Sequence, residues 1–513
     1  MGSLKRDSHL NTTIYSATPI GINAHIVNVE VDVSDERRGF FIVGLPDITI
    51  RESGKRITTA LKSSNIIVEQ SSISVNLAPA GLRKEGALFD LAIAMGILQS
   101  IGHLHMSKQF IDETLFVGEL SFDGSIKSIN GALVIANDAL RLKKKRIILP
   151  EDNAHEAALS PDIEIIGVKS IQHLIRYLKN EIKIDSTVTN IDEYSEVTNS
   201  TIDFSDVKGQ YGAKRALQIA AAGRHNILFS GPPGSGKTML AKRLPTIMPA
   251  MSFNEIIQTT KIYSISGNLN KRSLITERPF RSPHHSSSTP SLLGGGQSPK
   301  PGELSLAHNG ILFLDELLEF KQSTLESLRQ PLESGITDIS RVNYNVSYPC
   351  DFLLVAALNP CPCGYFGDKN TPCKCSSTII KRYRDKLSGP LADRIDIKVV
   401  VEGVTYDESQ EVKKDTTLSS YVLYDGVEKA LDMQYKRFNS KDKSNSKIQA
   451  HEVELYCKTT QEAQELLKMA FTKMNMSMRT YHKVLKVART IADIDQSELI
   501  EVQHIKEAIV FKS

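Results

Sequence analysis

The sequence contains no tryptophan, and no apolar run in it reaches the roughly 18 residues that a membrane span requires. Its N-terminus also lacks the apolar stretch of a secretory signal. Hydrophobic residues still make up 41% of the 513 residues and charged residues 24%, which excludes disordered and fibrous classes. We therefore expect a folded cytoplasmic protein with no membrane partner, and a chain of this length should form more than one domain.

The sequence also has a small net charge and few cysteines. A net charge of +3 gives no sign of a general affinity for nucleic acid, so any basic surface must be local. Five of the six cysteines fall within Cys350–Cys375, which is unlike the spread framework of a disulfide-rich secreted domain. Two C-x-C pairs in this stretch could supply four thiolates to a structural Zn²⁺, and free thiols are the alternative. The four residues are Cys361, Cys363, Cys373 and Cys375.

The hydrophobic pattern divides the chain into four parts. Residues 11–180 alternate strand-like and helix-like runs and indicate an α+β domain. Residues 181–203 are largely polar and indicate a linker. Residues 204–402 place apolar strands between helices, as in a parallel α/β sheet, and residues 403–513 have the pattern of a helical bundle.

A phosphate-binding loop follows the predicted strand at 226–230 and precedes a helix, which is the context that the motif G-x-x-x-x-G-K-[ST] requires. The backbone amides of such a loop bind the phosphates of ATP, Lys237 reaches the β and γ phosphates, and the Thr238 hydroxyl ligates Mg²⁺. The loop consists of Gly231, Pro232, Pro233, Gly234, Ser235, Gly236, Lys237 and Thr238.

Two further strands should bring polar side chains to the same sheet edge. Four apolar residues precede Asp315 and Glu316, so Asp315 is expected to bind Mg²⁺ through water and Glu316 to polarise the attacking water. A strand at 352–358 ends at Asn359-Pro360, and Asn359 is our predicted sensor of the γ-phosphate. An ordinary Asn-Pro turn is the alternative.

These elements, in this order, resemble the AAA+ ATPases, and further segments resemble the Mg-chelatase-like ComM/YifB family over nearly the whole chain. The segments are Gly44-Leu45-Pro46-Asp47, Val75-Asn76-Leu77-Ala78-Pro79-Ala80, Arg278-Pro279-Phe280-Arg281-Ser282-Pro283-His284-His285 and Leu387-Ser388-Gly389-Pro390-Leu391-Ala392-Asp393-Arg394-Ile395-Asp396. The resemblance implies an AAA+ core with a helical lid and a homo-hexamer, formed with ATP and DNA. It also implies a helicase that acts on single-stranded or branched DNA and promotes branch migration in recombination and natural transformation, with recombination proteins as partners.

The resemblance also assigns roles between subunits. Arg394 matches an arginine finger, whose guanidinium would stabilise charge on a neighbouring subunit's γ-phosphate. Arg479 matches a second sensor, which would couple the nucleotide state to movement of the lid. For either arginine alone, a surface salt bridge is the alternative.

The stretch between Thr238 and Asp315 is longer than a minimal strand–helix–strand unit needs, so it contains an insertion. Its basic and aromatic side chains suit phosphate neutralisation and base stacking, and the resemblance places such loops at a hexamer pore. An ordered surface loop or subunit contact is the alternative. The predicted DNA residues are Arg278, Phe280, Arg281, His284 and His285, with Arg341 on a hairpin predicted at 334–349.

The N-terminal domain resembles the Lon-protease fold, but Leu88 stands where Lon proteases carry the nucleophilic serine and Leu133 where they carry the catalytic lysine. Nucleophilic activation needs that hydroxyl and amine, so we predict no peptidase activity. Besides the helicase, the sequence leaves open a Mg-chelatase-type ATPase that drives metal insertion into a porphyrin. It also leaves open a non-enzymatic DNA clamp, which Asp315, Glu316 and Arg394 disfavour.

Overall fold

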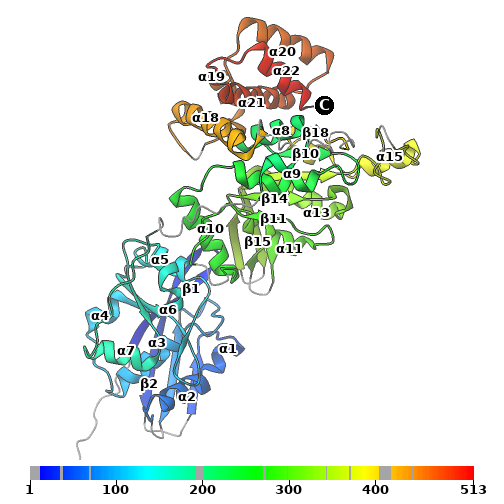
Figure 1. The fold of residues 1–513 in the computed structure, drawn as a ribbon. Coiled ribbons are helices and arrows are strands. Elements are labelled where there is room, and N and C mark those ends of the chain that lie inside the picture. The colour runs from blue at the N-terminus through cyan, green and yellow to red at the C-terminus, as the bar shows by residue number, and fades with distance from the viewer. Residues whose placement is uncertain are drawn as a thin grey trace, which may run out of the picture. The chain divides into compact units, whose positions relative to one another are not determined.

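The computed structural model describes residues 12–34, 39–68, 71–190, 202–269, 273–296, 299–341, 344–368, 371–403, 418–441 and 443–512. The chain forms two compact units, which are drawn in Figure 1. Unit 1 comprises Met1–Glu196, Phe253–Ile275 and Ile339–Tyr348, and unit 2 comprises Val197–Ser252, Thr276–Asp338 and Pro349–Ser513. Two segments of unit 1 therefore fall inside the range 204–402 that the sequence suggested for the core. The predicted mixed α/β class, with a parallel core sheet, C-terminal helices and an α+β N-terminal part, is confirmed.

Unit 1 is built on a mixed sheet with the order β1-β2-β4-β3. Its strands are β1 (Thr12–Ile20), β2 (Asn23–Ser34), β3 (Gly39–Val43) and β4 (Ser72–Ala78). Along β2 the side chains alternate between buried and more exposed positions, as expected for a strand with one covered face. The buried helix α3 (Asp90–Ser100) packs against β1 and β2 and supplies much of this core.

A second sheet of unit 1 has the order β5-β8-β9 and is parallel: β5 (Thr114–Phe116), β8 (Arg146–Pro150) and β9 (Glu164–Val168). A short ribbon pairs β6 (Glu119–Leu120) with β7 (Ile126–Lys127). The remaining helices of this unit are α1 (Ile48–Arg51), α2 (Ser53–Ser63), α4 (Lys108–Glu113), α5 (Ala132–Ala139), α6 (Glu151–Ala157), α7 (Ile171–Leu178) and α10 (Phe253–Ser266). Leu133 lies fully buried in α5, and Leu88 is partly buried and packs against the apolar clusters of unit 1.

Helix α10 is distant in sequence from the rest of unit 1 but belongs to its core. The Ser264 hydroxyl accepts a hydrogen bond from the Gly131 amide at 3.0 Å and donates one to the buried Glu156 carboxylate. Hairpin residues Ile339, Val346 and Tyr348 form an apolar cluster with Ile20 and Ile22. That hairpin pairs β15 (Ile336–Arg341) with β16 (Tyr344–Pro349), as the sequence predicted.

Unit 2 contains a five-stranded sheet with the order β11-β14-β17-β10-β18, in which all neighbouring strands are parallel. The strands are β11 (Phe280–Arg281), β14 (Ile311–Leu314), β17 (Leu353–Leu358), β10 (Ile227–Ser230) and β18 (Ile397–Val400). β14 is buried throughout and β10 and β17 almost throughout, as expected for a sheet covered on both faces. Parallel pairing brings the C-terminal ends of β10, β17 and β14 to one edge.

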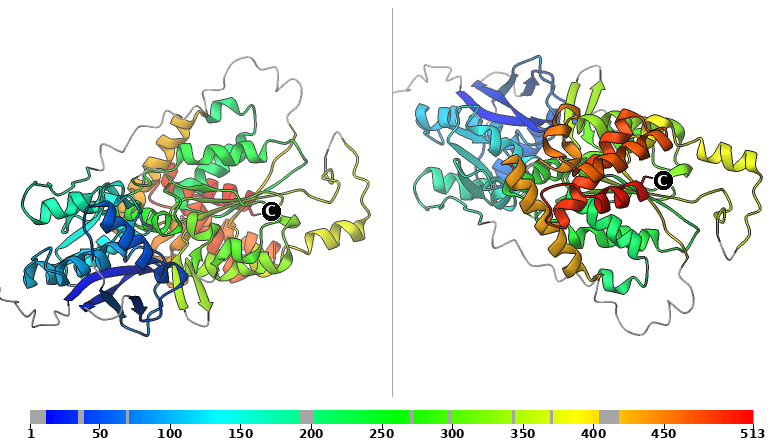
Figure 2. Two further views of the ribbon diagram at one scale, coloured as in Figure 1. Left: turned by 90° about the horizontal axis from the view of Figure 1, so that it is seen from below. Right: turned by 90° about the horizontal axis from the view of Figure 1, so that it is seen from above.

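The sheet is accompanied by helices, of which α8 packs against β10 and β18 and α9 against β17 (Figure 1). They are α8 (Tyr211–Gly223), α9 (Lys237–Arg243), α11 (Thr289–Leu293), α12 (Glu303–Leu306), α13 (Gln322–Ser327), α14 (Arg329–Ser334), α15 (Ser377–Arg384) and α16 (Gly389–Ala392). A two-stranded ribbon pairs β12 (Gly294–Gly295) with β13 (Lys300–Pro301). Figure 2 shows α15 extending away from the sheet.

The C-terminal helices form a lid, in which α18 and α21 pack on α8. They are α18 (Ser420–Phe438), α19 (Val453–Tyr456), α20 (Gln461–Lys473), α21 (Met478–Ile494) and α22 (Val502–Val510), the orange to red helices of Figure 2. In the part of the chain that the structure describes, no helix is both long enough and apolar enough to cross a bilayer.

A buried ion-pair network holds the lid together, and its loss should be costly. Asp493 is buried and accepts hydrogen bonds from Arg437, Arg489 and the Asn445 amide. We predict that Asp493→Ala destabilises the lid by about 3–5 kcal/mol, because it leaves two guanidinium groups without their carboxylate. Hydrogen–deuterium exchange across α21 and thermal unfolding measure the change. Asp495→Ala, which removes a more exposed carboxylate 3.4 Å from Arg215, should cost under about 1 kcal/mol. Equal effects of the two variants would contradict the prediction.

Candidate functional site

The phosphate-binding loop lies between the end of β10 and the start of α9. Gly234 and Gly236 have left-handed φ angles of 78° and 91°, which glycine adopts at no steric cost. Gly231 is needed for a different reason: a Cβ added there would lie 2.1 Å from the carbonyl oxygen of Val401. The loop therefore passes directly against the chain that leaves β18.

Lys237 is almost completely buried, with 8% of its surface exposed. Its Nζ donates to the carbonyl oxygens of Gly231 and Pro232, each at 2.8 Å, and lies 3.3 Å from Oδ1 of Asn359. Burial lowers the pKa of the amine, and the charges of Asp315 and Glu316 act in the opposite direction. The side chain is thus a buried cation surrounded by oxygen atoms, the chemistry that suits a phosphate oxygen.

Thr238 and Asp315 meet across the sheet edge. The Thr238 hydroxyl donates to Oδ2 of Asp315 at 2.7 Å, so a helix start and a strand end bring together two oxygen ligands of the kind that Mg²⁺ prefers. The next residue, Glu316, has a left-handed φ of 50°, and its backbone amide donates to Oδ1 of Asp315 at 2.9 Å. This turn directs the chain sharply away from β14 and leaves the Glu316 carboxylate half-exposed.

Three of the predicted catalytic residues therefore lie at the same sheet edge. Glu316, Asn359 and Lys237 follow β14, β17 and β10, which are consecutive strands of the sheet. Arg394 and Arg479 lie elsewhere in unit 2. They line a cleft of about 650 Å³ with Arg224, Lys483 and Lys486, and none of its described lining residues belongs to Gly231–Thr238.

Both arginines face carboxylates in this cleft. Arg394 is mostly buried, forms an ion pair with Glu333 and donates to the carbonyl oxygen of Pro390 at 2.7 Å. Arg479 is half-exposed, and its Nη1 lies 3.9 Å from Asp393. In an isolated subunit these guanidinium groups contact carboxylates of the cleft and not the phosphate-binding loop of their own chain.

The predicted DNA residues separate into two groups. Arg278 donates to the carbonyl oxygens of Pro249 and Asn309, each at 2.6 Å, and Arg281 makes a two-pronged ion pair with Glu303 at 2.7 and 2.8 Å. The Phe280 ring stacks on Phe313 with centroids 6.0 Å apart. These three side chains have structural partners inside unit 2. By contrast, His284 and Arg341 are exposed and His285 is partly exposed.

Sequence reasoning missed one contact of the site. Nδ1 of His285 lies 3.1 Å from Oε2 of Glu316. His285 was singled out as a DNA residue, but no sequence pattern connects it to a carboxylate 31 positions later. Only the sheet topology could have indicated this contact. Because β11 and β14 are parallel neighbours, the loop after β11 begins at the sheet edge where Glu316 lies.

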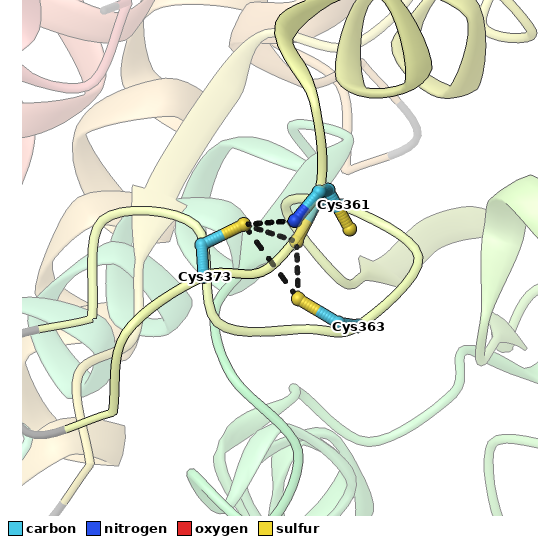
Figure 3. A group of neighbouring side chains, drawn as sticks. Cys361, Cys363 and Cys373 are labelled. Carbon is cyan, nitrogen blue, oxygen red and sulfur yellow. Dashed lines mark hydrogen bonds between the residues drawn. The ribbon is translucent and has the colours of Figure 1, made fainter.

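The four clustered cysteines meet in one place, directly after Asn359-Pro360. Figure 3 shows three of them: Sγ of Cys361 lies 3.3 Å from that of Cys363, and both lie 3.6 Å from that of Cys373. With Cys375, the four sulfur atoms lie within 4.8 Å of one another. Backbone amides, first that of Tyr365 and then that of Lys374, lower the pKa of the Cys363 thiol to about 6.

This arrangement fits a tetrahedral thiolate site. Zn–S bonds of about 2.3 Å place four sulfur atoms roughly 3.8 Å apart, close to the distances found here. The sulfur separations are far longer than a disulfide bond of about 2.05 Å. By comparison, Cys350 and Cys457 lie buried elsewhere.

Comparison with known proteins agrees with this architecture. Residues 203–409, 29–153 and 417–512 match families described as magnesium chelatase subunit ChlI, subunit ChlI of Mg-chelatase and the ChlI C-terminal region. The chain is 40% identical over 505 residues to competence protein ComM of Haemophilus influenzae, covering 98% of this chain and 97% of that protein. It is 37% identical over 504 residues to the uncharacterized protein YifB of Escherichia coli, covering 98% and 96%. Identity to the magnesium-chelatase 67 kDa subunit of Chlorobaculum parvum is 26% over 161 residues, 31% of this chain and 23% of that subunit.

The sheet and its phosphate-binding loop define a P-loop ATPase of the AAA+ class. Within that class, the chain belongs to the Mg-chelatase-like ComM/YifB family. The family uses ATP and Mg²⁺, and the site fits both: Lys237 and the loop amides suit the phosphates, and the paired Thr238 and Asp315 oxygens suit the cation.

The close approach at Gly231 gives a test that removes no polar group. We predict that Gly231→Ala weakens binding of a non-hydrolysable ATP analogue about ten-fold, or ~1.4 kcal/mol, because overpacking against Val401 costs ~1–3 kcal/mol. Isothermal titration calorimetry measures the affinity. Gly212→Ala is the matched control, since no atom lies within 4 Å of a Cβ added there. Unchanged affinity in Gly231→Ala would refute the assigned contact.

Proposed function

We propose that this chain is a cytoplasmic, hexameric, ATP-hydrolysing DNA motor, a helicase that promotes branch migration in recombination and natural transformation. The observation that carries the proposal is the match to a competence protein at 40% identity over almost the full length of both chains. Such a match includes the N-terminal unit, the sheet, the insertion and the lid together. Recombination proteins that handle the same branched DNA are the expected partners.

The ATP chemistry follows from the residues at the sheet edge. Mg²⁺, held by Thr238 and Asp315, would neutralise charge on the phosphates. Lys237 binds the terminal phosphates, Asn359 orients them, and the Glu316 carboxylate polarises the water that attacks the γ-phosphorus. The water's proton is transferred to the carboxylate as ADP leaves.

Assembly is supported by the cleft that contains Arg394 and Arg479. Neither arginine contacts its own phosphate-binding loop. The cleft also contains Lys483, Lys486 and Arg224, of which Lys483 pairs with Asp396 and Arg224 with Asp351, so an anionic ligand would take the place of carboxylates there. We infer that a neighbouring subunit's nucleotide is that ligand, with Arg394 exchanging Glu333 for the γ-phosphate.

The second candidate is a Mg-chelatase-type ATPase, favoured by the descriptions of the three matching families. Against it stands the short similarity to a chelatase subunit, which covers only 31% of this chain. A porphyrin that raises ATP turnover when DNA does not would favour this candidate over the motor.

Turnover of ATP with and without a four-way DNA junction tests the motor. We predict that the junction raises turnover of the wild-type chain, and that Glu316→Gln lowers turnover about 10²–10⁴-fold while ATP still binds, because the amide cannot accept the water's proton. Turnover is measured by phosphate release and binding by calorimetry. Normal turnover in Glu316→Gln would show that another group acts as the base, and a junction without effect would contradict the motor.

We also propose that the cysteine cluster, Cys361, Cys363, Cys373 and Cys375, holds a structural Zn²⁺. Four thiolates at tetrahedral spacing select a soft or borderline metal such as zinc over Mg²⁺. The metal would close the loop between β17 and α15.

Metal content tests this assignment. We predict about one zinc per chain in the purified protein by inductively coupled plasma mass spectrometry, and loss of that zinc in Cys373→Ser, since three remaining thiolates bind far more weakly. Cys457→Ala is the control, because this buried thiol lies outside the cluster and should leave the zinc in place. A metal-free wild-type chain with four titratable thiols would favour the free-thiol alternative.

A further inference from the structure

The cysteine loop, which joins β17 to α15, is attached to the sheet edge in two places. Near its start, Gly364 packs on Pro233 of the phosphate-binding loop, and a Cβ added to this glycine would lie 2.5 Å from the proline ring. After its end, Arg384 of α15 donates to the carbonyl oxygen of Pro360 at 3.1 Å. Pro360 directly follows Asn359, so these contacts hold the loop beside that side chain.

Helix α15 is also attached to the turn that follows β14. The Tyr383 hydroxyl donates to Oε1 of Glu319 at 3.0 Å. Nζ of Lys386, just after the helix, donates to the carbonyl oxygen of Leu318 at 2.9 Å. The turn begins at Glu316, the expected catalytic base. A displacement of α15 would therefore act on the turn that carries this carboxylate.

The proposed zinc would join these attachments to one another. Cys361 lies two residues after Asn359, and Cys375 directly precedes Ser376, whose hydroxyl caps α15 by accepting from the Ile379 amide at 3.4 Å. A metal bound by all four thiolates therefore ties the end of β17 to the start of α15. Zinc and nucleotide would then stabilise the same arrangement of the sheet edge.

The cysteines differ in their access to solvent. Cys361 is buried, whereas Cys363, Cys373 and Cys375 are partly exposed. The sulfur atoms of Cys363 and Cys373 lie 3.6 Å apart (Figure 3), and these two residues are far enough apart in sequence to avoid the short ring of a C-x-C disulfide. We propose that Cys363 and Cys373 are a peroxide-sensitive pair, whose oxidation to a disulfide releases the zinc and weakens ATP binding. This inference rests on the proposed zinc site, and it adds a redox control of the ATP chemistry.

The reaction with hydrogen peroxide is a two-electron oxidation. The sulfur of one cysteine attacks a peroxide oxygen, the O–O bond breaks, and a sulfenic acid and a hydroxide ion are formed. The sulfur of the other attacks the sulfenic sulfur, the S–S bond forms, and a second hydroxide ion leaves. Both Zn–S bonds break, and the two remaining thiolates, Cys361 and Cys375, hold zinc too weakly to keep it. The disulfide joins only Cys363 to Cys373, so β17 is no longer tied to α15.

The first test compares reduced and peroxide-treated protein that carries its zinc. Peroxide should release about one zinc per chain, measured with a chromogenic chelator, and should weaken binding of a non-hydrolysable ATP analogue at least about five-fold, the lower end of typical coupling between two sites. Peptide mass spectrometry identifies the disulfide between Cys363 and Cys373. Dithiothreitol with zinc should restore the affinity, which excludes methionine oxidation as the cause, because methionine sulfoxide is reduced by dedicated enzymes. Cys457→Ala is the control and should respond as wild type does.

The second test needs no oxidant. If zinc and nucleotide stabilise the same arrangement, the ATP analogue must tighten zinc binding by the factor by which zinc tightens analogue binding. Zinc affinity is measured by competition with a chelator. Gly364→Ala, which displaces the loop from Pro233 but keeps all four thiols, should reduce this factor. Gly367→Ala is the matched control and should preserve it, since its φ of 84° is close to the 89° of Gly364 but no atom lies within 4 Å of the added Cβ.

The outcomes separate the redox claim from the zinc assignment. Unchanged analogue affinity after complete zinc release overturns the inference, and so does a cluster that keeps both its zinc and its thiols in excess peroxide. If the untreated chain contains no zinc, the zinc assignment fails on its own. In that chain, an analogue affinity that does not change when the disulfide forms overturns the redox claim as well.

Discussion

The ammonium group of Lys237 is buried at the C-terminal edge of a parallel sheet, and the rest of the site is arranged around this charge. Burial alone lowers the pKa of the amine, so the charge is retained only if oxygen atoms surround it. Those oxygens come from the loop after β10, from Asn359 after β17 and from the acidic pair after β14. Such convergence requires the three strands to be adjacent and parallel, which is the sheet order found.

The parts of this arrangement that depend on local sequence could be predicted from it. The strand Ile311–Leu314 ends directly before Asp315, as its hydrophobic pattern indicated, because that pattern is sharp and ends at a polar residue. The phosphate-binding loop was equally clear from its glycines and its position between a strand and a helix. The start of helix α3 at Asp90 is different, because it depends on residues distant in sequence. The Asp90 carboxylate is bound by Ser53 and Arg56, so a distant interaction fixes the position of the helix start.

Contacts between residues distant in sequence explain most of what could not be predicted. From composition, Arg278, Phe280 and Arg281 look like one basic and aromatic surface. Their partners Asn309, Phe313 and Glu303 follow 22 to 33 residues later, and only the folded chain brings them together. Helix α10 belongs to unit 1 for the same reason, through Ser264 and Glu156. In each case the sequence pattern shows what kind of side chain is present. It does not show whether that side chain already has a hydrogen-bond or packing partner elsewhere in the chain.

The loop that contains the four clustered cysteines depends both on local sequence and on contacts between residues distant in sequence. Its sequence begins two residues after Asn359, and its fold brings Gly364 against Pro233: a Cβ added at Gly364 would lie 2.5 Å from the Pro233 ring. The loop therefore packs on the phosphate-binding loop while it continues directly from β17. Arg384 adds a third attachment by donating to the carbonyl oxygen of Pro360 at 3.1 Å. A loop fixed in this way limits the movement of Asn359 relative to Lys237. Its contribution to the site is thus mechanical, since none of its thiols has to contact a ligand for the loop to keep Asn359 beside Lys237.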